Sequence, residues 1–263
     1  MKKTILITGA SRGIGAAIAR RLAFFDGEPS RLILNCNTDT EGLATVIDEI
    51  NQAVPDCRIV PMICDLSDAE ARSTAFARAV DATGGHTPHI LINNAGIADI
   101  GLLQDLSPDR LMAILSTNLA AALDLSRLCI PGMVRRIHDS ETQISMSDAK
   151  PTCAILNISS VWGSVGASCE VAYSAAKGGL NAMTHALAKE LAPSSIPVNA
   201  IACGLIDTQM NHCLTAEELT EVIDQIPAGR MASPDEVARL CELILSAPAY
   251  LTGQVIGFDG GWI

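Results

Sequence analysis

Tyr173 and Lys177 are the two side chains whose types and spacing best fit a chemical step. Four residues apart on a helix, they would lie one turn apart on the same face. A free tyrosine has a pKa of about 10 and is a poor acid or base at neutral pH, whereas a nearby cation favours the phenolate and lowers that pKa. The spacing therefore predicts a tyrosine that donates and accepts a proton. Alone the pair is a weak signal, because a Tyr and a Lys four apart on an exposed helix usually form nothing.

Ser160 supplies the context for that pair. The run Ile155–Ser160 is predicted to be a strand that ends in two hydroxyl groups, and the glycine-containing loop Val161–Glu170 separates it from Tyr173. Ligands of open α/β sheets bind outside the carboxyl ends of the strands, so Ser160 and Tyr173 are expected to meet there. The alternative is that Ser160 only caps a helix or turn.

A glycine-rich segment, Thr8–Gly15, follows the first predicted strand and opens the first predicted helix. Its glycines permit a tight turn and a close approach to a pyrophosphate, and the helix N-terminus offers free N–H groups and a positive dipole. The spacing is GxxxGxG rather than the usual GxGxxG fingerprint, but its position after an N-terminal strand predicts a nucleotide site. The residues expected to contact the cofactor there are Gly9, Ser11, Arg12, Gly13, Ile14 and Gly15.

Residues after the second and third predicted strands bear on the choice of cofactor. NAD enzymes usually place an acid after the second strand to bind the ribose hydroxyls, whereas here Asn37 stands in that tract and the first acid is Asp39. Arg12 could face a 2′-phosphate, so the sequence favours NADP (as NADPH). NAD stays possible because Asp39 is near, and Arg12 could be a solvated surface charge. Asp65 and Leu66 end the third strand, where the adenine is expected, although Asp65 could also cap the next helix.

Alternating strands and helices must position these residues. Seven apolar runs have the nearly continuous pattern of parallel strands covered on both faces: Thr4–Thr8, Arg31–Asn35, Arg58–Cys64, Ile90–Asn93, Cys153–Ser159, Val198–Ala202 and Gln254–Phe258. Helices are predicted between them at Gly13–Phe25, Thr40–Ala53, Ala69–Ala82, Ser107–Arg136, Glu170–Leu191 and Ser233–Ser246. The fold class is therefore α/β, a single-domain Rossmann-type doubly wound parallel sheet of about seven strands with helices on both faces. No linker divides residues 1–263, and the polar stretch Ile137–Thr152 is interpreted as a surface insertion.

The composition disfavours several partners and compartments. The formal net charge is −11, so neither nucleic acid nor an anionic membrane surface is an expected partner, because like charges repel. The nine cysteines form no CxxC pair and no metal-ligand cluster with His, which predicts no metal site and buried thiols in a reducing compartment. The apolar stretch near the start is too short for a signal peptide, and a cytoplasmic protein is expected.

Taken together, the motifs resemble those of the short-chain dehydrogenase/reductase family. TGASRGIG at Thr8–Gly15, NNAG at Asn93–Gly96, Asn118, Ser160 and YSAAK at Tyr173–Lys177 occur in the family's order and spacing, and the likeness extends to Asp259-Gly260-Gly261. The resemblance implies an NAD(P)-dependent enzyme that moves a hydride between a nicotinamide and a carbonyl/alcohol pair.

The resemblance also implies roles for four catalytic residues. Tyr173 is the general acid in reduction and the base in oxidation, and Lys177 holds the nicotinamide ribose and tunes the tyrosine. Ser160 hydrogen-bonds the substrate oxygen and stabilises the charge that develops on it. Asn118 helps to hold a water that relays the proton to solvent, and its place inside a predicted helix, where Asn is unfavourable, independently suggests a functional position.

Further cofactor contacts are implied by the resemblance for Asn93, Ala95, Gly96, Ile206 and Thr208. The chain departs from the family at Cys203-Gly204, where Pro-Gly is usual. The loss of proline is expected to loosen the turn beside the nicotinamide without removing a catalytic group.

Within the family the chain looks most like the bacterial 3-oxoacyl-[acyl-carrier-protein] reductases, which implies a small-molecule carbonyl or acyl thioester substrate. Other ketones, such as steroids, sugars and small ketones, are the alternative. An acyl carrier protein is a doubtful partner, because the carrier is acidic like this chain and Ser194-Ser195 replace an expected basic residue. The substrate residues implied are Ser160, Trp162, Tyr173, Leu205 and Met210, with Asn211–Gln225 as a lid. A homotetramer (or dimer) that packs the two long helices against their mates is also implied.

Two other classes compete with this interpretation. A catalytically silent NAD(P)-binding protein would have no physical reason to keep Tyr173 and Lys177 one turn apart opposite Ser160. A hydrolase would need a nucleophile elbow of the GxSxG type, which the sequence lacks.

Overall fold

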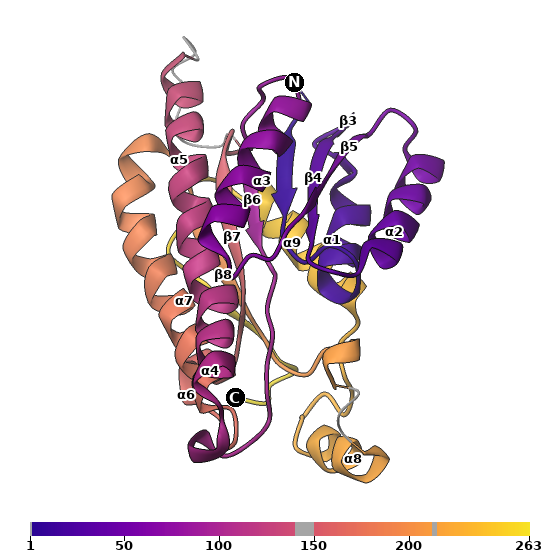
Figure 1. Ribbon diagram of the computed structural model, residues 1–263, viewed down its shortest axis with the longest axis vertical. Helices are drawn as coiled ribbons and strands as arrows, with labels where there is room; N and C mark the ends of the chain where they lie inside the picture. The colour runs from indigo at the N-terminus through magenta and orange to yellow at the C-terminus, as the bar shows by residue number, and fades with distance from the viewer. Residues whose placement is uncertain (1, 140–149, 212–214) are drawn as a thin grey trace.

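The computed structural model describes residues 2–139, 150–211 and 215–263. Its centre is a seven-stranded sheet in the order β5-β4-β1-β6-β7-β8-β9, and every neighbouring pair is parallel (Figure 1). The order reverses direction between β1 and β6, which is where open α/β sheets form their ligand crevice. The strands are β1 Thr4–Ile7, β4 Arg31–Cys36, β5 Arg58–Ile63, β6 Ile90–Asn93, β7 Ala154–Ser160, β8 Val198–Cys203 and β9 Val255–Phe258.

Helices cover both faces of this sheet and bury two separate apolar cores. On one face α1, α2 and α9 contribute to the first core, which includes Ile18, Leu43 and Val237. On the other face α3, α5 and α7 form the second core, which includes Leu125 and Leu191. These helices are α1 Gly13–Leu22, α2 Thr40–Ala53, α3 Ala69–Ala82, α5 Ala121–Asp139, α7 Val171–Leu191 and α9 Pro234–Ser246. The doubly wound fold predicted from the sequence is confirmed, and each of the seven predicted strands is found to within one residue at either end.

One prediction was wrong near the N-terminus. The helix expected over Gly13–Phe25 ends at Leu22, and Phe24–Phe25 (β2) pairs antiparallel with Glu28–Pro29 (β3). The loop between them is Asp26-Gly27, with φ of 58° and 79°. Two positive φ angles in a two-residue loop are typical of the type I′ hairpin turn, for which Asp-Gly is a favoured pair. The Asp-Gly signal in the sequence outweighs the apolar run that suggested a longer helix.

The long helix predicted from Ser107 is interrupted in its middle. It comprises α4 Pro108–Leu115, a π-helical turn at Ser116–Ala120 (η2), and α5. By length and composition alone the whole helix, Pro108–Asp139, could cross a membrane, with a mean hydropathy of 1.3 in an 18-residue window. In this protein its residues Leu125, Cys129 and Met133 are fully buried within the second core, so the apolar surface has a structural use.

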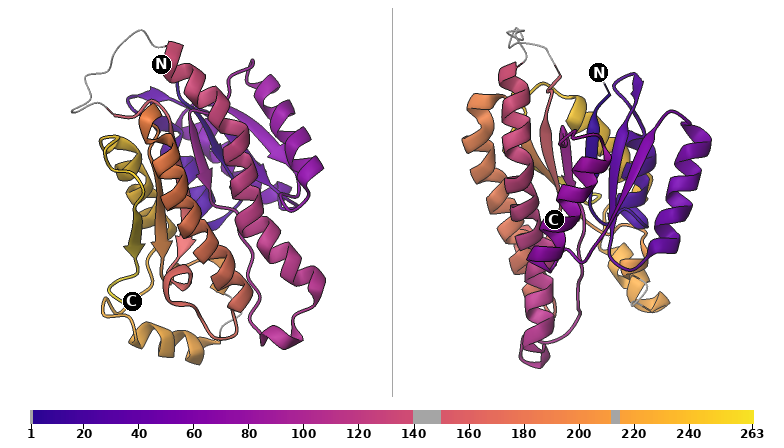
Figure 2. Two further views of the ribbon diagram at one scale, coloured as in Figure 1. Left: turned by 90° about the vertical axis from the view of Figure 1, so that its left-hand side faces the viewer. Right: turned by 45° about the horizontal axis from the view of Figure 1, so that its top comes forward.

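Short elements complete the carboxyl end of the sheet. They are η1 Leu103–Asp105, α6 Trp162–Val165, η4 Gln209–Asn211 and α8 Ala216–Asp224, whereas η3 Ala192–Ser194 lies at the amino end of the sheet, between α7 and β8. Helix α8 belongs to the segment expected as a lid and begins with a capping box between Thr215 and Glu218. It lies at the same end of the molecule as the C-terminus (Figure 2). Of the predicted insertion Ile137–Thr152, the first three residues belong to α5, and residues 140–149 lie outside the described residues.

Candidate active site

The glycine-rich loop is packed too closely for side chains. Gly9 and Gly13 have φ of 63° and 54°, the left-handed region that favours glycine. A Cβ on Gly15 would lie 2.1 Å from the Gly9 carbonyl oxygen. Asn94, which was not among the predicted site residues, ties this loop to β6 because its Nδ2 donates to the carbonyls of Thr8 (2.8 Å) and Gly9 (3.1 Å).

Residues that follow β8, in the other half of the sheet, lie opposite the glycine-rich loop. A Cβ on Gly13 would meet Thr208 Cγ2 at 3.3 Å, so Thr208 lies over the loop as the predicted contact requires. Ile206 is buried and joins Ala232 through an isolated β-bridge, which fixes the backbone just before Thr208. The backbone N–H of Ala95 donates to Thr8 Oγ1 at 2.9 Å.

The Asn93 side chain links the central strands. Its side chain is buried and its Nδ2 donates to Asn157 Oδ1 at 2.8 Å, below the carboxyl edge of the sheet. Asn157 in turn donates to Thr184 Oγ1 at 2.9 Å, which links β6, β7 and α7. Asn93 therefore serves as a strut between elements, and the residue of this motif that reaches the glycine loop is Asn94.

At the adenosine end, Arg12 and Asp39 face each other across the loop. Arg12 Nη1 lies 3.4 Å from Asp39 Oδ2, and the Arg12 side chain is 62% exposed. The other oxygen of Asp39 accepts from the Gly42 N–H at 3.1 Å and so caps α2. Asn37 is exposed beside them. Both carboxylate oxygens of Asp39 thus have protein partners.

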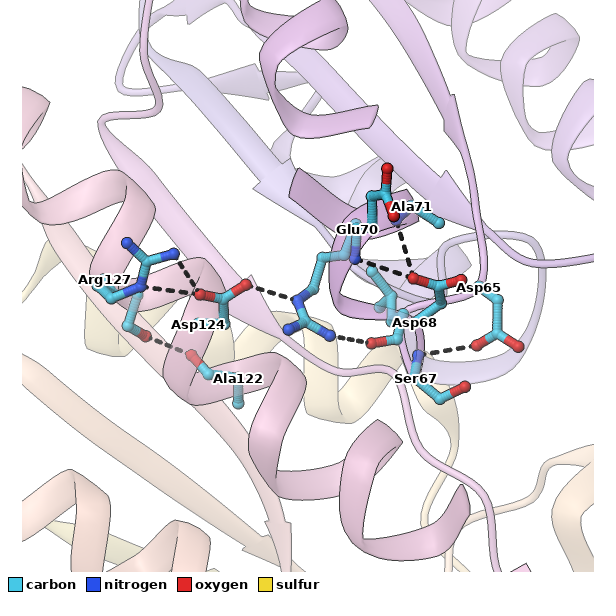
Figure 3. Close-up of polar contacts among 11 residues, drawn as sticks. Asp65, Ser67, Asp68, Glu70, Ala71, Ala122, Asp124 and Arg127 are labelled. Carbon is cyan, nitrogen blue, oxygen red and sulfur yellow. Dashed lines mark hydrogen bonds and ion pairs between the residues drawn. The ribbon is translucent and has the colours of Figure 1, made fainter. Parts of the chain in front are cut away.

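Asp65 and Leu66 follow β5 as predicted, but Asp65 does not cap the next helix. That role belongs to Asp68, which accepts from the N–H groups of Glu70 and Ala71 (Figure 3). The Asp65 carboxylate accepts instead from Ser67 N at 2.8 Å and closes a local turn.

The turn at Leu66 is anchored from beneath by Arg72. This buried guanidinium donates to the Leu66 carbonyl oxygen and to Asp124 of α5, the latter at 2.8 Å. Asp124 also accepts from the exposed Arg127 at 2.6 Å (Figure 3). The adenosine side of the groove is therefore coupled to the long helix that carries Asn118.

Ser160, Tyr173 and Lys177 meet at the carboxyl end of β7. Ser160 acts on the Tyr173 phenol as a hydrogen-bonding neighbour that lowers its pKa, and Ser160 Oγ accepts from the backbone N–H of Trp162 at 3.2 Å. Lys177 Nζ lies 5.5 Å from the centre of the Tyr173 ring and donates to the Ile158 carbonyl oxygen at 2.8 Å. The geometry brings these three predicted catalytic side chains together.

The electrostatics of this cluster correct one expectation. Burial raises the pKa of Tyr173 above its ordinary value, with further contributions from Cys203 and Glu170, and the hydrogen bond from Ser160 opposes this only in part. Burial likewise lowers the pKa of Lys177 to about 8. The rise in the Tyr173 pKa is opposite in direction to the predicted lowering, because desolvation is its largest cause, and the phenol stays protonated at neutral pH.

Cys203 stands where the family usually has proline, and its turn is closed by the backbone. Gly204 N donates to the Phe258 carbonyl oxygen at 2.9 Å, and Val161 N donates to the Cys203 carbonyl oxygen at 3.0 Å. Burial raises the pKa of the Cys203 thiol to about 12, against a smaller lowering by Lys177. A neutral thiol is a poor nucleophile, so the group acts here as a small apolar neighbour of Lys177.

Asn118 lies in the π-helical turn of the long helix. Its Nδ2 donates to the carbonyls of Ile97 (2.8 Å) and Ile114 (2.9 Å), and its buried Oδ1 has no hydrogen-bond partner among the described residues. A Cβ on Gly96 would lie 2.5 Å from that Oδ1 and 3.6 Å from Lys177 Nζ. Single π-helical turns occur often at functional sites, and this one turns a buried acceptor toward the lysine.

Three of the predicted substrate residues, Trp162, Leu205 and Met210, lie in different surroundings. Trp162 begins α6 directly after the Ser160 strand and packs edge-to-face on Trp262, with ring centroids 4.9 Å apart. Leu205 lines a cavity of about 140 Å³ with Arg230, Phe258 and five other residues. Met210 is 48% exposed in η4.

Sequence reasoning missed two residues of this region. Trp262, next to the C-terminal end of the chain, had no motif to reveal it. Glu170 precedes α7 by one residue, and its charge is among the causes that raise the pKa of Tyr173. Its position three residues before the tyrosine, one helical turn away, was the available signal.

The groove fits a nicotinamide dinucleotide. The glycine loop lies at the N-terminus of α1, where backbone N–H groups suit a pyrophosphate, and Thr208 lies next to Gly13. At the chemical end, the partner-free Asn118 Oδ1 and the Lys177 ammonium lie on either side of Gly96, where no side chain intervenes.

Comparisons with known proteins agree with this geometry. A family model described as short chain dehydrogenase matches residues 3–219. The uncharacterised oxidoreductase YmfI of Bacillus subtilis is 36% identical over 265 residues, which cover 100% of this chain and 99% of that protein. The 3-oxoacyl-[acyl-carrier-protein] reductase FabG of Vibrio cholerae is 32% identical over 98% of this chain and 96% of its own length.

A solved structure from Beutenbergia cavernae, provisionally named an NAD(P)-dependent gluconate 5-dehydrogenase and holding NADP at low occupancy, is also similar. It is 31% identical, the match covers 99% of this chain and 96% of that one, and the TM-score is 0.84. The family match spans most of the chain, and the residues that carry it converge in one groove. The protein belongs to the short-chain dehydrogenase/reductase family of oxidoreductases.

Proposed function

We propose that the protein is an NADPH-dependent reductase of ketones in which Tyr173 is the proton donor. The observation that carries this proposal is the contact of Ser160 with Tyr173 above a buried Lys177. The tyrosine is protonated at neutral pH because burial raises its pKa, which is the form that reduction requires.

The residues divide the reaction between them. Ser160 and Tyr173 hydrogen-bond the carbonyl oxygen and stabilise its developing negative charge. Tyr173 then gives its proton to that oxygen, while the Lys177 ammonium stabilises the phenolate that remains. The Oδ1 of Asn118 holds a water through which the proton is replaced. A bound nicotinamide supplies the hydride, and the glycine loop, Lys177 and Thr208 are the groups that would hold it.

The preference for NADP rests on the Arg12–Asp39 pair. An acid that selects NAD must offer its oxygens to the ribose hydroxyls, but Asp39 already caps α2 and pairs with Arg12. The exposed Arg12 guanidinium is a suitable partner for a 2′-phosphate, because guanidinium groups bind phosphate with two hydrogen bonds. The NADP in the Beutenbergia cavernae structure supports the same choice.

The substrate class we favour is a β-ketoacyl thioester. The support is the similarity to 3-oxoacyl-[acyl-carrier-protein] reductases of several bacteria, which carry out that reaction by name. A protein-bound thioester is less suitable, because α8 carries four acidic residues and no basic one and the carrier is acidic. A cyclic or otherwise bulky ketone is the alternative class.

Assembly and location complete the proposal. Met112 and Leu123 of the long helix and Val171 of α7 are each 46–57% exposed; this exposed apolar surface on the two long helices supports a proposed homotetramer, which sedimentation velocity would test. The proposal includes a cytoplasmic location, where NADPH is available to the enzyme.

The experiment is NADPH oxidation with a short β-ketoacyl thioester, a bulky cyclic ketone and no substrate, repeated with NADH and with Tyr173→Phe. We expect turnover of the thioester, a preference for NADPH, and a loss of roughly 10²–10⁴ in kcat for Tyr173→Phe, as is usual for removal of a general acid. Binding of nucleotide without turnover of any ketone in either direction would refute the proposal and favour a silent NADP-binding protein.

A further inference from the structure

Asn35 is a polar residue in the apolar strand β4 that the proposed reaction does not use. It follows Leu32, Ile33 and Leu34 and is only 1% exposed. Asn is depleted in strands, and burying an amide is unfavourable unless it is hydrogen-bonded. The hydrogen bonds of this side chain must therefore offset its burial, so their partners indicate what the residue holds in place.

The side chain and the main chain of Asn35 both bind the glycine-rich loop. Asn35 Oδ1 accepts from Gly9 N at 3.2 Å, and the Asn35 carbonyl oxygen accepts from Ala10 N at 2.7 Å. Gly9 has a φ of 63°, a conformation that turns the chain from β1 toward α1. Asn35 fixes that turn from β4, whereas Asn94 fixes it from the β6 side by donating to its carbonyl oxygens.

The amide nitrogen of Asn35 binds the end of the neighbouring strand. Strand β4 lies between β1 and β5 (Figure 1), and Met62 on β5 is the register partner of Asn35. Asn35 Nδ2 donates to the carbonyl oxygens of Met62 at 2.9 Å, Cys36 at 3.2 Å and Cys64 at 3.3 Å. Cys64 leads into the turn at Leu66, where the adenine is expected. One amide thus joins the loop expected at the pyrophosphate to the strand end expected at the adenine.

Among side chains of this size, the surroundings of Asn35 suit only an amide. They offer one N–H group and three carbonyl oxygens, so the position needs an acceptor and a donor on one planar group. An ionised Asp only accepts and Leu does neither, whereas the Asn amide does both. These partners therefore explain a residue that strand propensity disfavours.

We propose that Asn35 is a positioning residue for the cofactor, which holds the glycine-rich loop and the carboxyl end of β5 at the separation that a bound dinucleotide requires. Its contacts lie in the loop after β1 and at the ends of β4 and β5, whereas Ser160 and Tyr173 belong to β7 and α7. This inference rests on the proposed nicotinamide-dependent function and deepens it, because it assigns part of the cofactor affinity to a residue outside the glycine-rich motif.

The test uses Asn35→Ser, whose hydroxyl is too short to bridge the loop and β5, with Asn199→Ser as the matched control. Asn199 is also a buried strand residue, and it too binds one N–H group and one carbonyl oxygen. It accepts from Gln254 N at 2.9 Å and donates to the Leu251 carbonyl oxygen at 2.7 Å. These contacts lie near the start of β8, away from the carboxyl edge of the sheet where the ligand crevice forms.

The measurement is the Kd for NADPH by calorimetric titration. We expect Asn35→Ser to raise this Kd at least about tenfold, because a displaced loop loses hydrogen bonds to the cofactor phosphates. Asn199→Ser should leave it within about twofold of the wild-type value, because distant independent sites do not couple. In steady-state assays with the β-ketoacyl thioester, the KM for NADPH should rise in Asn35→Ser by a larger factor than kcat falls.

Thermal unfolding of the free proteins separates positioning from general destabilisation. Both variants lose buried hydrogen bonds, so both should unfold at a lower temperature than the wild type, whereas only Asn35→Ser should bind NADPH more weakly. Asn35→Thr, with a side chain that strands favour, is measured beside it, with the same expectation, in case Asn35→Ser does not fold.

The binding data also separate this inference from the proposed function. If the wild-type protein binds NADPH but reduces no ketone, the proposed function fails and the comparison of Kd values still decides the role of Asn35. The same Kd for NADPH in the Asn35 variants as in Asn199→Ser, or no binding of NADPH by the wild-type protein, overturns the inference.

Discussion

Gly15→Ala is the substitution whose effect the structure specifies most closely. The added Cβ would lie 2.1 Å from the Gly9 carbonyl oxygen and 2.6 Å from Asn94 Nδ2. Because Cβ contacts below 3.0 Å essentially never occur, the first turn of α1 and the Thr8–Gly9 backbone must separate by roughly 1 Å. Both contacts are with groups that cannot rotate away, since one is backbone and the other is hydrogen-bonded to backbone.

The expected cost has two parts. Overpacking of this kind destabilises proteins by about 1–3 kcal/mol, which for a chain of this length lowers the Tm by roughly 2–10 °C. The same shift moves the N–H groups that would face the cofactor phosphates, and loss of one hydrogen bond to a charged group costs about 1.5–3 kcal/mol. We therefore expect NADPH to bind about 10- to 100-fold more weakly.

The assay is calorimetric titration with NADPH beside thermal unfolding of the free protein. Gly101→Ala is the matched control, because the Gly101 Cβ would meet nothing within 4 Å and its φ is not in the left-handed region. If Gly15→Ala bound NADPH as tightly as Gly101→Ala and unfolded at the same temperature, the close packing of the loop on α1 would not be what shapes the phosphate site.

Two further predictions concern stability. His89 accepts from Thr4 N at 3.0 Å inside the protein, and burial lowers its pKa to about 3. Below the unfolded-state value of about 6.5 the unfolded chain takes up a proton that the folded protein does not, so stability is complete above that pH and falls by about 2 kcal/mol by pH 5. Urea unfolding at pH 7 and pH 5 should show this loss, and His89→Asn should reduce it whereas the control His138→Asn, at an exposed position, should not; an equal loss in both variants would assign it elsewhere. Arg72→Met should cost about 3–5 kcal/mol in urea unfolding, because it removes the buried donor of the Leu66 carbonyl oxygen and leaves Asp124 with only the exposed Arg127 as its partner. Arg127→Met breaks the exposed bond to the same Asp124 (Figure 3) and should cost less than about 1 kcal/mol; similar losses for the two variants would contradict the importance of burial.

Local patterns along the chain determined the architecture of this protein. A parallel strand covered on both faces must be apolar throughout, so the strands were visible as continuous runs. The helices between them showed their ends through caps, such as Ser107-Pro108 and Ser233-Pro234, whose hydroxyls accept from the N3 backbone as expected. The convergence of Ser160, Tyr173 and Lys177 followed from the same patterns, because the carboxyl ends of parallel strands meet at one edge.

What depended on contacts between distant segments could not be found in this way. The pKa of Tyr173 is raised mainly by its burial in the packed protein, which no spacing along the sequence reveals. The side chain of Asn94, just after β6, contacts the glycine loop, whereas that of Asn93, the last residue of β6, contacts Asn157 on the neighbouring strand. Trp262 lies 100 positions from Trp162 in the chain, and only the closing of β9 against β8 brings them together. The sequence by itself determined the strands, the helices and the motif residues that reach the site, and the tertiary structure alone decided their protonation and their remaining neighbours, because burial and long-range contact are properties of the packed chain.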